Sequence, residues 1–487
     1  MEGKMKKLLF FMGLLSSGLY GASIDHIQTY SPDYLSNQSQ TGMVNEVSAY
    51  YNPAGLSRLE KGKYVHLGLQ FARGHEKMSY KGKEHKAVLN QLIPNVSLTS
   101  VDENGAYFFT FGGLAGGGKL EYDGVSGIDV LSDLDQFKPL GVYDKGSSLT
   151  GKNLYEQATI GRAFTINDQL SISVAGRIVH GSRNLKGSLN IGANPTTAYK
   201  QAKVQQVTQE VSRAVDAATQ GSGLSAAQIA AIKQQKTTEA LTLLQKKMNG
   251  LQQTGLSGDL DSKREAWGYG FQLGVNYKVN DKLNLAARYD SRIKMNFKAK
   301  GSENQLQTTD IIGSNIGLST FYPQYAINSK IRRDLPAILS VGASYKLTDN
   351  YFVSTSANYY FNHHAKMDRV TTFGGHEHGR DYKNGWEIAL GNEYKLNDKF
   401  TLMGSVNYAR TGAKNSSFND TEYALNSVTL GAGVRYRYDE TLSFTASVAH
   451  FIYEKEDGNF KEKYKVNENQ KYHKEITAFG LSVTKKF

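Results

Sequence analysis

Four basic residues stand where their side chains are able to bind a carboxylate. They lie in segments whose apolar residues fall at every second position, and they occupy the alternate positions. Because successive side chains of a β-strand point to opposite faces, we expect all four on the inward, polar face. An arginine there donates two parallel hydrogen bonds to a carboxylate, but it also pairs with acidic neighbours such as Asp290. The four residues are Arg177, Arg288, Arg292 and Lys294.

Two further patterns invite a chemical interpretation, but neither meets the requirements of the site that it suggests. Four histidines, at 363, 364, 376 and 378, lack the fixed spacing of a metal site, so solvated loop histidines are the favoured interpretation. Gly113 to Lys119 has the G-x-x-x-x-G-K spacing of a phosphate loop, but Leu120 replaces the magnesium-binding Ser or Thr and no apolar helix follows. No nucleophile–base pair or carboxylate pair is apparent. We therefore expect no enzyme activity, no metal and no cofactor.

The composition favours a large antiparallel sheet. The chain of 487 residues has 30 Tyr, 21 Phe and 49 Gly against 7 Pro and no Cys. Aromatic residues suit strands, and glycines suit positions where side chains must be small. The absence of Cys excludes disulfides and thiolate metal sites. The net charge of +12 comes from scattered basic residues, which argues against nucleic-acid binding.

The first 22 residues have the pattern of a secretory signal peptide. Lys4, Lys6 and Lys7 precede the apolar run 8–15, and small residues end at Ala22. No later stretch approaches the roughly 18 apolar residues of a membrane helix. An exported chain without such helices can still span a membrane as a closed β-barrel.

Alternating segments fill the chain from residue 62 to residue 487. In the sharpest, Trp267, Tyr269 and Phe271 alternate with small or polar residues, which predicts one apolar and one polar face. A soluble sheet would bury the apolar face, whereas a membrane barrel turns it to lipid. The fourteen predicted strands lie near 63–73, 92–101, 106–117, 152–165, 169–189, 263–279, 282–299, 329–347, 350–370, 381–396, 399–413, 423–438, 441–455 and 471–487.

The connections between these segments favour the membrane barrel. Tight turns such as Asn167-Asp168 and Asn397-Asp398 alternate with connections of about ten to over seventy residues. Short turns at one end and long loops at the other are typical of outer-membrane barrels, which also have an even number of strands. The terminal Phe487 and the in-phase Phe479 fit such a barrel, although Lys485 breaks the alternation. The fold prediction is therefore all-β, a 14-stranded antiparallel transmembrane β-barrel.

Two segments lie outside this pattern. Residues 190–262 carry apolar residues at three- and four-residue spacing on either side of Gly221-Ser222-Gly223, with a capping box at Ser225–Gln228. We expect a helical hairpin on the extracellular side, with or without a role in ligand binding. Residues 23–61 are polar and have no period-two run, so we expect a segment packed inside the barrel. It contains Asn52-Pro53-Ala54-Gly55, whose residue types form a turn.

Together, the signal peptide, the Asn52-Pro53-Ala54-Gly55 motif and fourteen strands ending at Phe487 resemble the FadL family of outer-membrane transporters. These transporters carry long-chain fatty acids and other hydrophobic compounds. The resemblance covers the whole mature chain and implies that residues 23–61 form a hatch, a plug inside the lumen. It further implies that Asn52, Pro53 and Ala54 stabilise this plug beneath the substrate path.

A glycine-rich stretch in the third segment fits the same family. Glycine within a strand often marks a bulge or kink, and in FadL-like proteins a kink in the third strand opens a lateral hole through which a ligand leaves into the membrane. The alternative is a glycine-rich strand end that passes into a loop. The residues concerned are Gly112, Gly113, Gly116, Gly117 and Gly118.

The resemblance implies passive transport of hydrophobic molecules by a monomer in the outer membrane. Its expected partners are long-chain fatty acids, outer-membrane lipid and the barrel assembly machinery, with no nucleic acid. An adhesin or receptor that displays loops on a barrel scaffold is the alternative from another class. An open porin for polar solutes is a third, which a plug argues against.

Overall fold

The computed structural model describes residues 31–135, 137–254, 256–300, 305–308, 316–317, 326–371, 377–378, 382–420 and 422–487. The predicted signal peptide and residues 23–30 of the predicted hatch lie outside these ranges. Within them, no helix combines the length and the apolar character needed to cross a bilayer.

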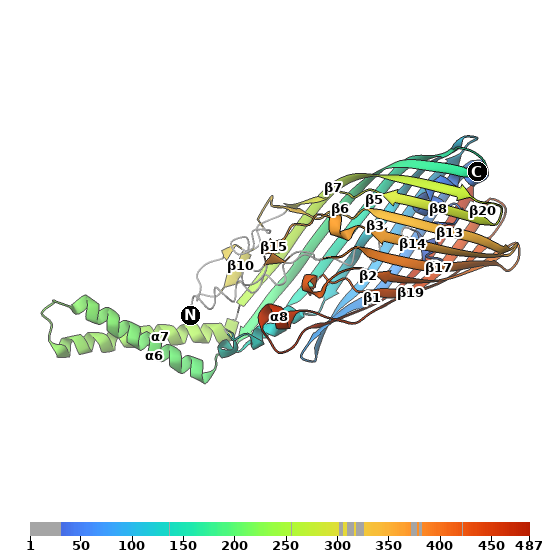
Figure 1. Cartoon of the computed structure of the whole chain (residues 1–487). Helices are drawn as coiled ribbons and strands as arrows, with labels where there is room; N and C mark the ends of the chain where they lie inside the picture. The colour runs from blue at the N-terminus through green and yellow to red at the C-terminus, as the bar shows by residue number, and fades with distance from the viewer. Residues whose placement is uncertain are drawn as a thin grey trace.

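The wall is a closed antiparallel β-barrel of fourteen long strands (Figure 1). The last strand returns to pair with the first, from Tyr64 opposite Lys486 to Ser79 opposite Lys471, and closure removes the free edges of an open sheet. The strands are β1 (Gly62–Tyr80), β2 (Lys83–Val101), β3 (Gly105–Tyr122), β5 (Ser148–Thr165), β6 (Leu170–Ala193), β7 (Leu256–Lys278), β8 (Leu283–Asp290), β13 (Ile338–Thr348), β14 (Tyr351–Tyr360), β17 (Gly385–Lys395), β18 (Phe400–Arg410), β19 (Ser427–Arg437), β20 (Leu442–Tyr453) and β22 (Lys471–Lys486).

Shorter elements lie inside the barrel and at its long-loop end. The helices are α3 (Pro32–Ser36), α4 (Ser48–Tyr51), α5 (Ser126–Asp129), α6 (Thr197–Thr219), α7 (Ala226–Thr254) and α8 (Phe460–Tyr464), with 3-10 turns η2 (Pro53–Arg58), η3 (Val130–Asp133), η4 (Lys138–Leu140), η7 (Asn362–His364) and η9 (Asn415–Ser417). The short strands are β4 (Val142–Asp144), β9 (Asn296–Lys300), β10 (Gln305–Thr308), β11 (Ile316–Gly317), β12 (Lys330–Arg332), β15 (Val370–Thr371), β16 (Glu377–His378) and β21 (Glu456–Asp457).

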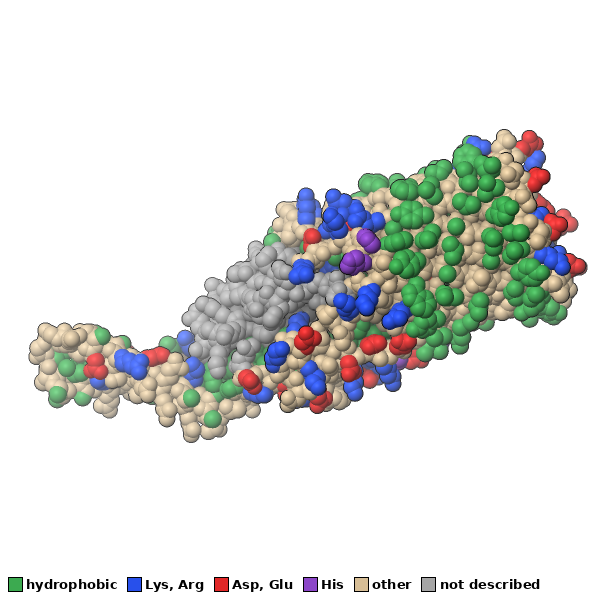
Figure 2. Space-filling view, viewed as in Figure 1, with side chains coloured by type: hydrophobic (Ala, Val, Ile, Leu, Met, Phe, Trp, Pro, Cys, Tyr) green, Lys and Arg blue, Asp and Glu red, His purple; other side chains and the backbone are tan. Residues whose placement is uncertain are grey.

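The outer face of the wall is apolar, as the alternation predicts. Trp267 and Tyr269 of β7 are 61% and 69% exposed, whereas the intervening Gly268 is buried. Figure 2 shows the result as a belt of hydrophobic side chains around the wall. In a soluble protein such residues would pack on a second layer, so this belt is the surface that faces lipid.

Two connections differ in detail from the sequence prediction. The gap expected between residues 73 and 92 is wrong, because β1 and β2 form one long hairpin with the two-residue turn Lys81-Gly82. Both turn residues have positive φ, 50° and 78°, as a type I′ hairpin requires. Beyond the apolar belt these two strands consist mostly of polar residues. Apolar residues do not recur at every second position there, so the sequence pattern did not predict this part of the strands.

The helical hairpin is present and projects from the long-loop end (Figure 1). Its boundaries are narrower than 190–262, because β6 continues to Ala193 and β7 begins at Leu256. The predicted capping box forms: the Gln228 backbone N–H donates to Ser225 Oγ at 3.3 Å, and the Ser225 N–H donates to Gln228 Oε1 at 2.9 Å.

The N-terminal segment lies inside the barrel. Helix α3 packs against β18, β19, β20, β22 and β1, while η2 packs against β2, β3, β5, β6 and β7. Since these strands surround the lumen, the segment crosses it from one side to the other. We call residues 31–61 the hatch.

Candidate functional site

The Asn52–Gly55 motif fastens the hatch to the wall. The Asn52 side chain donates from Nδ2 to Asn276 Oδ1 of β7 at 2.9 Å, and Ser171 Oγ of β6 donates to the Ala54 carbonyl at 2.7 Å. Pro53 starts the 3-10 turn η2, in which the Gly55 N–H donates to the Asn52 carbonyl at 2.9 Å. All four motif residues are buried.

Gly55 does not have a positive φ, so it is favoured by the space around it and not by a left-handed turn. A Cβ at this position would lie 3.2 Å from Asn52 Nδ2 and 3.3 Å from Val44 Cγ2. A side chain would therefore press on the amide that binds Asn276. The motif therefore connects the hatch to β6 and β7 through tightly packed, hydrogen-bonded residues.

Arg288 of β8 also binds the hatch to the wall, because its guanidinium donates hydrogen bonds to hatch carbonyls. Its Nη1 donates to the carbonyls of Tyr50 at 2.7 Å and Tyr51 at 3.0 Å, and its Nη2 lies 3.2 Å from Asp290 Oδ2. The side chain is 1% exposed. The prediction that Arg288 points inward is confirmed, but its contacts stabilise the plug.

Arg177 also points inward and completes the same network. Its Nε and Nη2 donate to Gln157 Oε1 at 3.0 and 2.7 Å, and its Nη1 lies 3.8 Å from Asp290 Oδ1. Asp290 therefore lies between Arg177 and Arg288. Such pairing with an acidic residue was the alternative to ligand binding for these two arginines.

Arg292 and Lys294 lie on the outside of the barrel, so the expectation that they point inward is wrong. Both are exposed, whereas Ile293 between them is buried. The cause is one extra residue: β7 advances seven residues from Gln272 to Glu265 while the facing chain advances eight, from Asp290 to Lys298. Such a bulge reverses the inside–outside alternation beyond it.

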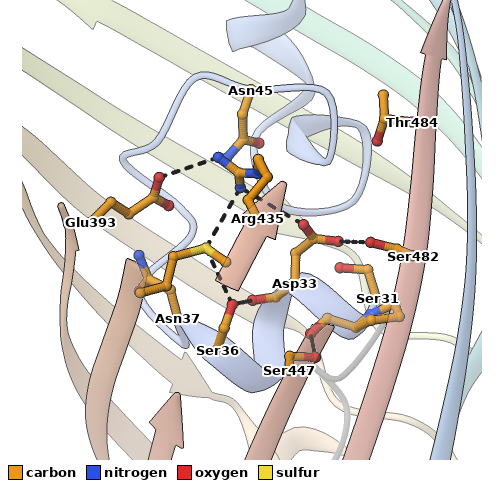
Figure 3. Close-up of polar contacts among 12 residues, drawn as sticks. Ser31, Asp33, Ser36, Asn37, Asn45, Glu393, Arg435, Ser447, Ser482 and Thr484 are labelled. Carbon is orange, nitrogen blue, oxygen red and sulfur yellow. Dashed lines mark hydrogen bonds and ion pairs between the residues drawn. The ribbon is translucent and has the colours of Figure 1, made fainter. Parts of the chain in front are cut away.

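At the other end of the hatch, Asp33 of α3 contacts three wall strands, and Figure 3 shows its contacts with Ser482 and Arg435. Ser482 Oγ of β22 donates to Asp33 Oδ2 at 3.1 Å, while His66 Nε2 of β1 and Arg435 Nη2 of β19 lie 3.5 and 3.8 Å from the carboxylate. Arg435 also donates from Nη1 to Glu393 Oε2 at 3.4 Å. This anchor was missed from the sequence. Strand phase places Arg435 on the polar face, but nothing in the pattern identifies Asp33 as its partner.

The glycine-rich stretch coincides with a break in the wall. The β2–β3 ladder runs from Val101 to Asn95, which pairs with Gly112, and resumes only at Leu89, which pairs with Leu120. On the other side of β3, the pairing with β5 shifts twice, at 113–115 and at 115–118. Gly117 belongs to the same strand. The predicted kink of β3 is therefore present.

Two of these glycines require their residue type. Gly116 has φ of +111° and Gly118 has φ of +67°, conformations that other residues rarely adopt. Gly113 has an ordinary φ, but an added Cβ would lie 2.8 Å from Ile93 Cγ2 across the break. Gly116 pairs with neither β2 nor β5, whereas Gly118 pairs with Asn153 of β5 but not with β2. The absence of a side chain at Gly113 leaves room for Ile93 at the break.

A mostly apolar cavity connects the hatch to this break. It has about 800 Å³ of space free of protein atoms, including its mouth. Leu35 of the hatch contributes to it, and Gly113 and Gly116 lie at the break, while Gln70 and Glu76 supply polar groups. The apolar lining comes from Leu35, Ala72, Leu89, Ile93, Leu114, Leu154, Phe451, Ile476 and Ala478.

A buried ion pair borders the cavity. Lys474 Nζ of β22 lies 2.9 Å from Glu76 Oε1 of β1, and it also lies 4.4 Å from the centroid of the Tyr423 ring. Both charged side chains are almost fully buried, so each compensates the desolvation of the other.

The alternative chemical patterns find no support in the described residues. His363 and His364 have rings 5.7 Å apart, His376 lies outside the described residues, and no group of three metal-ligating side chains occurs within them. The phosphate-loop spacing at Gly113–Lys119 lies within strand β3, where Lys119 pairs with Glu121.

Comparison with known proteins agrees with this architecture. Residues 35–487 match the model of the family described as outer membrane protein transport protein (OMPP1/FadL/TodX). The 47 kDa outer membrane protein of Pasteurella multocida is 26% identical over 208 residues, which are 41% of this chain and 46% of that protein. Outer membrane protein P1 of Haemophilus influenzae is 24% identical over 295 residues, 58% of this chain and 54% of that protein. The chain thus matches about half the length of these relatives.

Solved structures share the fold. A Pseudomonas aeruginosa FadL homologue superimposes with a TM-score of 0.63 at 13% identity and covers 97% of this chain and 100% of its own. The P. putida toluene transporter TodX superimposes with a TM-score of 0.62 at 16% identity. This match covers 95% of this chain and 99% of the TodX chain. The family match begins within the hatch, at residue 35, and extends over the whole wall. The chain is therefore an outer-membrane β-barrel of the outer membrane protein transport protein family (OMPP1/FadL/TodX).

Proposed function

We propose that this protein transports hydrophobic molecules passively across the outer membrane, with long-chain fatty acids as the preferred substrate class. The observation that carries the proposal is the cavity between Leu35 of the hatch and the break at Gly113–Gly118. Ligand pockets are usually apolar with a few polar groups, and this lining has that character. TodX is described as a toluene transporter, and a hydrophobic substrate of either kind suits such a lining.

The proposed path has three steps. The extracellular loops capture the ligand from water, the hatch rearranges, and the ligand leaves sideways between β2 and β3. Lateral exit is physically reasonable because a hydrophobic molecule that crossed a polar lumen would lose its favourable burial. The hatch anchors at Asn52, Arg288 and Asp33 hold the plug in the state described above.

The exit is tested by filling the gap at Gly113. In Gly113→Val, the added side chain meets Ile93 across the break. We expect uptake of radiolabelled oleate to fall at least about fivefold, in cells that lack their own transporter, because the opening narrows. Gly176→Val is the matched control, since a Cβ at Gly176 of β6 meets nothing within 4 Å. Equal uptake by the two folded, surface-exposed variants would contradict lateral exit.

A surface adhesin or receptor is the second candidate, and the projecting α6–α7 hairpin favours it. Replacing residues 197–254 with a short Gly-Ser linker distinguishes the two functions. A transporter retains measurable oleate uptake without the hairpin, because the cavity and the break lie in the barrel. An adhesin loses its function with the hairpin and shows no uptake above the empty-vector control in either form.

A further inference from the structure

Five lysines lie beside the apolar belt on the outer surface, four on β7, β9 and β12 and one in the segment between β8 and β9. We infer that this surface binds the phosphate groups of a glycolipid in the outer leaflet of the membrane. The lysine patch consists of Lys263, Lys294, Lys298, Lys300 and Lys330, all of which are exposed.

The strand register places like charges directly opposite one another. Lys263 of β7 faces Lys300 of β9, and Lys298 of β9 faces Lys330 of β12. Directly opposed like charges destabilise a sheet, since their Cβ atoms are only about 4.5–5.5 Å apart. Glu265 contacts both Lys263 and Lys300, whereas no described carboxylate pairs with Lys298 or Lys330, so the second pair is unfavourable unless an anion binds between its ammonium groups.

The protein supplies little negative charge to this patch. Glu265 contacts Lys263 at 3.2 Å and also pairs with Lys300. In the described part of the chain, no ion pair involves Lys294, Lys298 or Lys330. With five lysines and one carboxylate, the patch has a net charge of four positive units.

Two neighbouring acidic residues are engaged elsewhere, and the exposed Asp259 lies four residues from Lys263 along β7. Asp261 pairs with Lys186 at 2.8 Å, on the β6 side of β7. Asp334 is held by Arg332 at 2.8 Å and lies 3.7 Å from Arg292. These acids therefore neutralise other cations, and the charge of the lysine patch remains available to a ligand.

The position of the patch identifies the partner as a lipid. Trp267 and Tyr269 belong to the apolar belt, and Glu265 and Lys263 follow on the same face of β7. Two residues of a strand span about 6.6–6.8 Å, so Lys263 lies about 13 Å beyond Trp267, where headgroups replace acyl chains. Figure 2 shows Lys and Arg side chains gathered next to the belt toward the long loops. In barrels of this class that end faces outside, which places the patch at the outer leaflet.

Phosphate is the group that matches this arrangement. Lysine binds phosphate as a point charge, and clusters of basic residues at a membrane surface attract anionic headgroups. A headgroup with two phosphates is able to neutralise the Lys298–Lys330 pair together with Lys294 and the charge that Glu265 leaves on the Lys263–Lys300 pair. A single carboxylate, by contrast, would leave most of the net charge of four positive units unneutralised.

Retention of lipid A by the full-length protein in detergent micelles, measured by native mass spectrometry, tests the inference. We expect bisphosphorylated lipid A to be retained and its dephosphorylated form to be lost. The triple variant Lys294→Gln/Lys298→Gln/Lys330→Gln should bind the bisphosphorylated form at least about tenfold more weakly, because three charges are removed at the membrane surface. High salt should weaken wild-type binding in the same direction.

The matched control removes the same charge from the projecting hairpin, as Lys200→Gln/Lys246→Gln/Lys247→Gln, and should bind lipid A as the wild type does. Unchanged retention by the patch variant, or equal retention of the dephosphorylated lipid, would overturn the inference. Displacement by inorganic phosphate alone would also overturn it, because it would indicate a general anion site. Oleate uptake and the mobility of the unheated protein in gels should be unchanged in both variants, which keeps this test separate from the transport proposal.

Discussion

Two sides of the same wall differ in the continuity of their ladders. Strand β6 pairs with β7 without a shift from Leu170 opposite Tyr277 to Ile191 opposite Leu256, whereas β2 and β3 separate between Leu89 and Asn95. The hatch makes different contacts with the two sides. Its Asn52 motif is hydrogen-bonded to the continuous side, and its Leu35 lines the cavity that reaches the broken side. One side therefore holds the hatch by hydrogen bonds, and the other is the side at which we propose that the ligand leaves.

The difference arises from few residues. Gly116 and Gly118 take backbone conformations that remove β3 from the ladder. On β2, Pro94 lies in the unpaired stretch and has no N–H to donate. Both strands thus contribute to the break, while β6 and β7 carry glycines with ordinary φ at Gly176 and Gly268 and remain paired.

The largest expected effect comes from Arg288→Met on the anchored side. The variant removes the donor to the Tyr50 and Tyr51 carbonyls and leaves Asp290 with Gln272 at 2.8 Å and Arg177 at 3.8 Å. Breaking a buried ion pair costs about 3–5 kcal/mol when the remaining charge has no partner. Because Asp290 keeps Arg177 and Gln272, we expect a loss at the lower end of that range. Guanidinium unfolding in detergent micelles measures this loss.

Arg292→Met is the control for Arg288→Met. It makes the same change of residue type four positions further along the chain, where the arginine lies on the outer surface. We expect less than about 1 kcal/mol of destabilisation from this exposed position. Equal losses in the two variants would mean that the inward network does not anchor the hatch.

A reversible disulfide across the break should have the next largest effect, on transport. In Ile93→Cys/Gly113→Cys, the Gly113 Cβ would lie 2.8 Å from the present Ile93 Cγ2, and the two Cβ atoms come within the roughly 3.5–4.5 Å of a disulfide. We expect oleate uptake to fall at least about tenfold on oxidation and to recover with dithiothreitol. The chain has no other Cys, so the effect is specific to this pair.

Leu98→Cys/Phe109→Cys places the same crosslink in the intact part of the β2–β3 ladder, where these residues are directly paired. Its oxidation should leave uptake unchanged. Loss of uptake in this control would show that any crosslink between the strands inhibits transport, and the break would then have no special role.

Gly118→Ala should have a smaller effect, on stability. The residue has φ of +67°, and an L-side chain in the left-handed region costs about 1–2 kcal/mol. The new Cβ would also lie 2.9 Å from Gln91 Cβ, which a change of rotamer does not move, so the facing part of β2 must shift as well. Gly176→Ala, on the continuous side, should be neutral or slightly stabilising, because the unfolded chain loses freedom and the folded chain gains no contact. Thermal unfolding in micelles compares the two.

The barrel was predictable because its outer face repeats one physical requirement at every second position. Trp267, Tyr269 and Phe271 show this, and the fourteen strands and the family follow from the same pattern. The glycine run also located the kink of β3 correctly. These signals are local, so one sequence is enough to read them.

The contacts inside the lumen were not predictable in the same way. Arg292 and Lys294 were placed on the wrong face because a single bulged residue after Asp290 reverses the alternation, and no residue type marks it. The Asp33–Arg435 pair joins residues 402 positions apart in the chain, and periodicity carries no information on such pairs. The hatch itself was recognised from its lack of pattern, but its anchors required coordinates.

The smallest expected effect is that of Asn52→Ala, which probes the motif on the continuous side. The variant removes the hydrogen bond from Asn52 Nδ2 to Asn276 Oδ1, but Asn284 Nδ2 still donates to the same oxygen at 2.8 Å. Because the buried acceptor keeps a partner, the loss should be only about 0.5–1.5 kcal/mol of unfolding free energy. Hydrogen exchange of the hatch amides at residues 48–58 should nevertheless accelerate, while that of the β6–β7 ladder stays unchanged. Equal acceleration of exchange in the hatch and in the wall would show that the motif stabilises the barrel as a whole. That result would contradict the hypothesis that the hatch moves separately from the wall.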